Sequence, residues 1–87
     1  MAAKAEEKLI GRVTHYYSKL GVGMIELTDG ELHVGDMIHI RGKHTDFTQT
    51  VDSMQIEHQI VSHAEKGKVV GVKVKEKVRE ADQVFRV

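Results

Sequence analysis

The chain of 87 residues contains no cysteine, no proline and no tryptophan, and aromatic residues make up 5% of it. Without cysteine, neither a disulfide nor a thiolate metal site can reinforce the fold, and a cysteine nucleophile is excluded. The absence of proline removes one common protector of edge strands, so we expect closure of a sheet to satisfy its edges. No apolar run approaches the roughly 18 to 20 residues that a membrane span needs, so no membrane partner is expected.

The chain also lacks an excess of either charge, because 13 basic residues balance 13 acidic ones. A net charge of zero argues against nonspecific coating of nucleic acid. The charges are unevenly placed, however, since six cations and a single acid lie between Lys66 and Arg79. The first eight residues carry charges where a signal peptide has an apolar core. We therefore expect a flexible tail over residues 1–8, no targeting segment and a cytoplasmic location.

Short alternating segments separated by turn residues make up the rest of the chain. In residues 28–42, apolar side chains alternate with polar ones between turn signals at Asp29-Gly30, Gly35-Asp36 and Gly42. The alternation predicts strands over residues 9–17, 22–28, 37–41, 48–57, 59–62, 69–75 and 83–87. The core is predicted to contain Val13, Ile25, Leu27, Leu32, Val34, Ile38, Ile40, Val51, Ile56, Val70, Val72 and Val74. These patterns indicate an all-β fold, a single six- or seven-stranded antiparallel Greek-key β-barrel over residues 9–87.

The same segments resemble a known family. Residues 30–40 read Gly-x-Leu-x-Val-Gly-Asp-x-Ile-x-Ile, which resembles the signature of the second, β-barrel domain of translational GTPases such as elongation factor Tu and initiation factor 2. Residues 64–74 resemble that family's Ala-x-x-Gly-x-x-Val-Gly-x-x-Val element. The chain thus looks like a free-standing translation elongation factor-like barrel. Related barrels also form the last domain of proteins of the collagenase-like peptidase family that act on RNA.

The resemblance implies a barrel that contacts ribosomal RNA but lacks the GTPase domain. Gln55 and His58 stand where the tRNA-carrying members present a Glu and an Arg, so the resemblance does not extend to aminoacyl-tRNA contacts. A phosphate-binding loop is also missing, because Gly42-Lys43 leads to His44 and Gly67-Lys68 leads to Val69. We expect no binding of a nucleoside triphosphate.

The candidate nucleic-acid-binding residues are cations near the end of the chain. Lys73, Lys75, Lys77 and Arg79 repeat with a period of two, and in an extended segment they would share one face while valines fill the other. Such a stripe suits contacts to the phosphates of structured RNA or of a ribosomal surface, with Arg41 and Lys43 adding to it. The alternative is a half-exposed strand whose lysines serve solubility and prevent edge-to-edge aggregation.

The six histidines and the serines give little support to catalysis. The histidines lack recognisable ligand spacing, so no metal and no cofactor are expected, although a Zn or Ni site that joins His33 and His39 across a hairpin stays open. No serine lies in a Gly-x-Ser-x-Gly elbow, and no paired-carboxylate pattern is present, so we do not expect an enzyme.

Two classes of function follow from the sequence. The first is a non-catalytic module that binds structured RNA or the ribosome through the cations named above. The second is a protein-interaction adaptor that docks an apolar or mixed barrel face onto a separate catalytic subunit. Tyr16 and Tyr17 are adjacent, so one ring is expected to enter the core and the other to face outward, where it would either stack on a nucleobase or cover an end of the barrel.

Overall fold

The structure, a computed structural model, describes residues 7–87. This part of the chain forms ten strands and no helix. The strands are β1 (Lys8–Tyr17), β2 (Val22–Glu26), β3 (Leu32–His33), β4 (Met37–Arg41), β5 (Asp46–Thr50), β6 (Met54–Ile56), β7 (Gln59–Val61), β8 (His63–Ala64), β9 (Val69–Lys73) and β10 (Gln83–Arg86). Residues 7–87 accordingly contain no helix of the length and apolarity that crossing a membrane requires.

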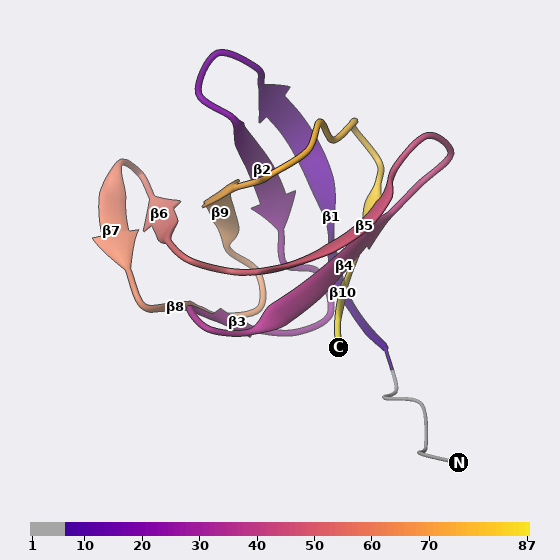
Figure 1. Cartoon of the computed structure of the whole chain (residues 1–87). Helices are drawn as coiled ribbons and strands as arrows, with labels where there is room; N and C mark the ends of the chain where they lie inside the picture. Colours follow the sequence, from indigo (N-terminus) through magenta and orange to yellow (C-terminus); the bar gives the residue numbers. More distant parts are fainter. Residues whose placement is uncertain (1–6) are drawn as a thin grey trace.

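Eight of the strands form one antiparallel sheet in the order β5-β4-β10-β1-β2-β9-β6-β7. Strands β3 and β8 form a separate antiparallel pair. The sheet curls around a common core into a half-barrel, with β3 and β8 at one end (Figure 1). The expected all-β, antiparallel fold is confirmed. The count of six or seven strands and the Greek-key closure are not confirmed.

Strand boundaries depart from the expected ones where the backbone bonds to a distant turn. The strand expected over residues 48–57 is two strands, β5 and β6. Between them, Val51 donates its N–H to the Asp36 carbonyl at 2.8 Å and accepts from the Gly35 N–H at 2.8 Å. These bonds take the backbone of Val51 out of the ladder and end β5.

A two-residue hairpin turn lies at a position without a glycine turn signal. Glu57 and His58 connect β6 to β7 with φ angles of 50° and 68°. Two consecutive residues with positive φ match the twist of a two-residue hairpin. Asp29-Gly30, by contrast, lies between β2 and β3, which do not pair with each other.

At its N-terminal end the described chain is already part of the fold. Strand β1 begins at Lys8, and Glu7 is bonded to a side chain of β4. Of the tail expected over residues 1–8, residues 1–6 lie outside the described part.

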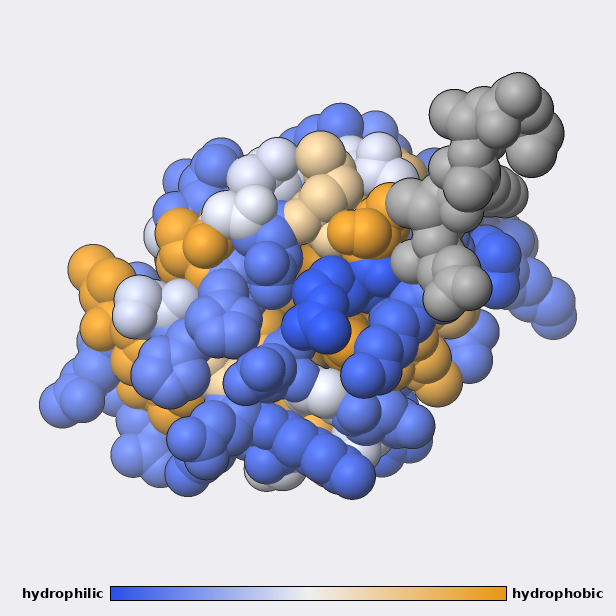
Figure 2. All heavy atoms as spheres, turned by 90° about the horizontal axis from the view of Figure 1, so that it is seen from below, coloured by the Kyte–Doolittle hydropathy of each residue, from blue (hydrophilic) through white to orange (hydrophobic). Residues whose placement is uncertain are grey.

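The core lies between the walls of the curled sheet and agrees closely with the sequence pattern. Ten of the twelve expected core residues are buried. Val34 is instead 41% exposed, and Ile56 is partly buried against the core. The remaining buried apolar residues are Ile10, Phe47, Met54, Ala64, Val78 and Val84. Seen from the end that carries β3 and β8, the surface is largely hydrophilic, and its apolar groups form separate spots (Figure 2).

Candidate functional site

The six cations expected to bind nucleic acid all lie at the surface. They are Lys73, Lys75, Lys77, Arg79, Arg41 and Lys43. Strand β9 ends at Lys73, so the next three cations along the chain lie in the segment that leads to β10. Val72, Val74 and Val78 are buried as expected, but the exposed Glu76 interrupts the alternation.

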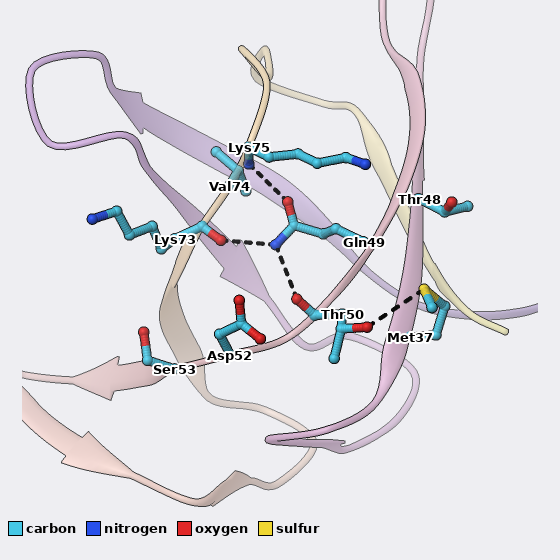
Figure 3. Close-up of a pocket in the computed structure, with 9 residues that line it drawn as sticks. All are labelled: Met37, Thr48, Gln49, Thr50, Asp52, Ser53, Lys73, Val74 and Lys75. Atoms are coloured by element: carbon cyan, nitrogen blue, oxygen red, sulfur yellow. Dashed lines mark hydrogen bonds between the residues drawn. The ribbon is translucent and has the colours of Figure 1, made fainter.

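The six cations do not form a single stripe. Lys73 and Lys75 extend their side chains in opposite directions from the backbone (Figure 3). The Arg41 guanidinium lies over the ring of Phe85, 4.8 Å from its centroid. Arg79 donates its backbone N–H to Asp82 Oδ2 at 2.8 Å, which fixes the turn before β10. The structure therefore does not bring all six cations together in one surface region.

A side-chain amide bridges the open side of the half-barrel. Gln49, on the edge strand β5, donates from Nε2 to the Lys73 carbonyl at 2.8 Å and accepts at Oε1 from the Lys75 N–H at 2.8 Å (Figure 3). One amide thus makes the two bonds that a neighbouring strand would make. The bridge joins β5 to the end of β9.

A hollow of about 640 Å³, which we call the seam groove, adjoins this bridge. It is lined by Met37, Thr48, Gln49, Thr50, Asp52, Ser53, Lys73, Val74 and Lys75. Catalysis by Ser53 would need a base within hydrogen-bond reach. Within residues 7–87, no hydrogen bond joins Ser53 to a histidine or a carboxylate. Ser53 therefore has no hydrogen-bonded base within the described part of the chain.

A second groove lies on the outer face of the sheet. Pairing places Met24 of β2, Gly71 of β9 and Gln55 of β6 side by side across three strands. Because side chains alternate along a strand, these positions face outward while Val72 and Met54 face the core. We call this hollow of about 320 Å³ the outer groove. It is lined by Tyr17, Leu20, Val22, Met24, Gln55, Glu57, His58 and Gly71.

Glycine makes the floor of the outer groove. A Cβ at Gly71 would lie 3.3 Å from Met24 Sδ, 3.3 Å from Val22 Cγ1 and 3.7 Å from the Gln55 carbonyl oxygen. The first two distances are shorter than ordinary van der Waals contacts, so a side chain at this buried position would press on Met24 and Val22. The missing side chain gives the sheet a dimple bordered by apolar atoms.

Two hairpin ends form the walls of the outer groove. On one side the β1–β2 connection presents Tyr17 and Leu20, which are 45% and 65% exposed. On the other side lie Glu57 and His58, whose positive φ angles turn β6 back into β7. Tyr16 packs against the core while Tyr17 faces out, as adjacent strand positions predict.

A third polar arrangement surrounds His39 on β4. Its Nδ1 lies 2.7 Å from Glu7 Oε2, and its Nε2 lies 2.5 Å from Asp46 Oδ1. The hydrogen bond with Asp46 raises the pKa of His39 above its ordinary value of 6.5; burial opposes this, and the hydrogen bond with Glu7 adds to it. A protonated imidazole can donate to both carboxylates at once, whereas a neutral one can donate to only one. His39 therefore ties the residue before β1 to β4 and β5.

This arrangement predicts a pH-dependent stability. A folded-state pKa above the unfolded value stabilises the fold below the unfolded pKa, and the stabilisation is lost as pH rises through the folded pKa. We expect the unfolding free energy of the wild type to exceed that of His39→Gln at about pH 5.5 to 6 and this excess to shrink above about pH 7. Urea titrations of both proteins measure the difference. An excess that stays constant up to about pH 8.5 would contradict the prediction.

The other histidines do not converge on a metal. His33 and His63 face each other across the β3–β8 pair, with ring centroids 5.7 Å apart. His33 Nδ1 lies 3.8 Å from Asp36 Oδ2, whereas His39 is engaged with its two carboxylates. The contact between His33 and His39 that the sequence left open is therefore absent. Within the described residues, no three histidine, aspartate or glutamate side chains gather in a way that could hold a metal ion.

Known proteins similar to this chain are proteases. The chain is 40% identical over 85 residues to a collagenase of Porphyromonas gingivalis, a match that covers 97% of this chain and 20% of the collagenase. It is 46% identical over 85 residues to an uncharacterized protease of Methanocaldococcus jannaschii, covering 97% of this chain and 21% of the protease. The chain thus spans about a fifth of the length of these relatives. No family model matches it.

The fold has a counterpart among solved structures. The C-terminal domain of a Geobacillus thermoleovorans protein described as a U32 peptidase superposes with a TM-score of 0.83. This match covers 99% of each chain, with 20% sequence identity. At that identity the match establishes a shared fold.

These comparisons correct the interpretation drawn from the barrel signature. The relatives are named collagenase or protease, and the matching fold is a domain of a U32 peptidase, not of a translational GTPase. The assignment as a translation elongation factor-like module that binds structured RNA or a ribosomal surface is therefore wrong. The chain matches one segment of a longer protein that is named a collagenase.

Sequence reasoning did not find the outer groove as a site. Gln55 and His58 were singled out only through the resemblance to tRNA carriers, and Tyr17 only as an outward ring. These residues come together because β9 pairs with both β2 and β6. No local sequence pattern reveals this pairing.

Proposed function

We propose that this half-barrel is a protein-interaction module that docks onto a catalytic domain of the collagenase or U32-peptidase type. The observation that carries the proposal is the extent of the match: 97% of this chain aligns with one fifth of a collagenase at 40% identity. The remaining four fifths of such a protein have no counterpart in this chain. A module of this kind acts by contact with that larger part, within one chain or between two chains.

We further propose that the module is not itself catalytic. Among residues 7–87, Ser53 makes no hydrogen bond to a histidine or a carboxylate, and the seam groove that contains it is bridged by the Gln49 amide. His39 is held on both ring nitrogens by carboxylates, so neither nitrogen is free to act on a substrate. These arrangements favour a structural or recognition role.

The test uses the Porphyromonas gingivalis collagenase from which the segment matching this chain has been deleted. We expect this chain to bind the shortened collagenase with one-to-one stoichiometry in a calorimetric titration. The heat-capacity change should be negative, because apolar surface is buried. The intact collagenase is the matched control: its own segment already occupies the docking position, so it should not bind. Gelatin hydrolysis by this chain alone would overturn the non-catalytic part of the proposal.

A hybrid collagenase provides a second measurement. This chain replaces the matching segment, and activity on gelatin is compared with that of the intact and the shortened protein. We expect the hybrid to regain activity that the shortened form has lost. If the chain neither binds the shortened collagenase nor restores activity in the hybrid, the docking proposal is wrong.

A further inference from the structure

We propose that the outer groove is the surface through which the module docks, and that it takes one apolar side chain of the catalytic domain flanked by a carboxylate. This inference rests on the proposed function. It names the part of the barrel that makes the contact and the chemistry of the partner.

The shape of the outer groove suits a single anchoring side chain. The lining includes Gly71, a buried residue whose missing side chain leaves a dimple that Met24 and Val22 closely border. The walls formed by the two hairpin ends keep the hollow narrow, at about 320 Å³. Anchors that fill small pockets of this kind supply most of the binding energy in protein interfaces.

The apolar surface around the dimple is exposed although a folded domain gains by burying such surface. Leu20 is 65% exposed and Tyr17 is 45% exposed, and both border the groove. Ile60, 79% exposed on β7, extends this surface because it pairs with Gln55, which lines the groove. A contiguous apolar patch with a polar rim is typical of a protein-binding site. The scattered apolar spots at the β3–β8 end lack this continuity (Figure 2).

The charge of the rim indicates the partner. Lys73 lines the hollow that continues from the groove past Leu20 and Ser53, and Lys19 lies on the other side of Leu20. No ion pair within residues 7–87 involves either lysine. Glu57 is the one acid among the groove-lining residues. The two free ammonium groups therefore complement a carboxylate next to the apolar anchor.

The seam groove is larger but suits a partner less well. Seven of its nine lining residues carry hydroxyl, amide or charged side chains, and the Gln49 amide already satisfies the backbone at Lys73 and Lys75. A partner strand could not bond to that backbone without displacing those hydrogen bonds. The outer groove needs no such displacement.

The test measures binding of full-length variants to the shortened Porphyromonas gingivalis collagenase defined above. Leu20→Glu places a negative charge on the exposed wall, opposite the expected carboxylate. Loss of a central anchor contact typically weakens an interface by about thirtyfold, which we expect for this variant. Val34→Glu is the matched control, because Val34 is an exposed valine outside the groove. It should bind like the wild type.

A second variant tests the floor without changing the charge. Gly71→Ala adds one methyl group 3.3 Å from Met24 Sδ and Val22 Cγ1, which must shift and change the shape of the floor. We expect binding to weaken by about tenfold. Melting curves of each variant establish that it is folded. If Gly71→Ala does not fold, Leu20→Glu carries the test, because its side chain projects into solvent.

The outcomes separate this inference from the proposed function. If the wild type binds and both variants bind equally well, docking occurs through another face and the inference is wrong, while the proposed function stands. If the wild type neither binds nor restores activity in the hybrid, the proposed function itself fails, and this inference fails with it. If Leu20→Glu abolishes self-association of the chain in sedimentation experiments but leaves collagenase binding intact, the occupant is a second copy, which also overturns the inference.

Discussion

Gly11→Ala is expected to destabilise the fold by at least about 3 kcal/mol, near the upper end of overpacking effects. A Cβ at Gly11 would overlap the carbonyl oxygen of Glu26 and lie 3.1 Å from its carbonyl carbon and 3.2 Å from Leu27 Cα. All three atoms belong to the backbone of the neighbouring segment. They cannot move away as a side chain would, because β2 is paired on both edges, with β1 and β9.

A thermal melt measures this effect. For a domain of this size, 1 kcal/mol shifts the Tm by about 4 to 8 °C, so the loss should exceed roughly 12 °C. The matched control is Gly23→Ala on β2. There the nearest atom to a new Cβ would be Val78 Cγ2 at 3.1 Å, a side-chain methyl that can shift. Equal melting temperatures for the two variants would show that β1 and β2 separate more easily than their backbone contact implies.

Most of the core could be predicted because inward and outward positions alternate locally along a strand. Ile38 and Ile40 are identified by this period alone, and both are fully buried. The period of two no longer identifies buried residues beyond the end of a strand. Val34 lies beyond the two residues of β3, in the turn before β4, and is exposed. Ile10 adjoins a register shift between Leu9 and Gly11, so simple alternation does not show that it is buried.

The cation stripe could not be judged from the sequence for the same reason. A period of two places side chains on one face only while the chain stays extended. Strand β9 ends at Lys73, and the segment beyond it turns so that Lys75 extends away from Lys73 (Figure 3). Lysine alternates with buried valine only from Val72 to Lys75, without producing an aligned row of charges.

The outer groove depends on information that no local pattern contains. Met24, Gly71 and Gln55 are far apart in the sequence and meet because β9 lies between β2 and β6. The barrel signature, in contrast, consists of turn glycines and inward isoleucines. Such residues specify the fold and are shared by barrels with different functions. That is why the signature led to the correct fold class and to the wrong functional family.

Ile38→Ala is expected to reduce the free energy of unfolding by about 2 to 5 kcal/mol. Ile38 lies on β4, where it is fully buried and pairs with Arg86 of β10 and Gln49 of β5. Truncation removes buried methyl and methylene groups and leaves a cavity that paired strands on both sides cannot close. Urea unfolding measures the loss as a lower midpoint with an unchanged slope.

Ile60→Ala is the matched control for this prediction, because it is the same chemical change at a position that is 79% exposed on the edge strand β7. Exposed substitutions of this kind usually change stability by less than about 0.5 kcal/mol. The two variants together test the inward assignment of β4 and the outward assignment of β7. A loss at Ile60 equal to that at Ile38 would mean that Ile60 is buried in solution, for instance against a second copy of the chain. A negligible loss at Ile38 would place that side chain outside the core and contradict the arrangement of β4 in the sheet.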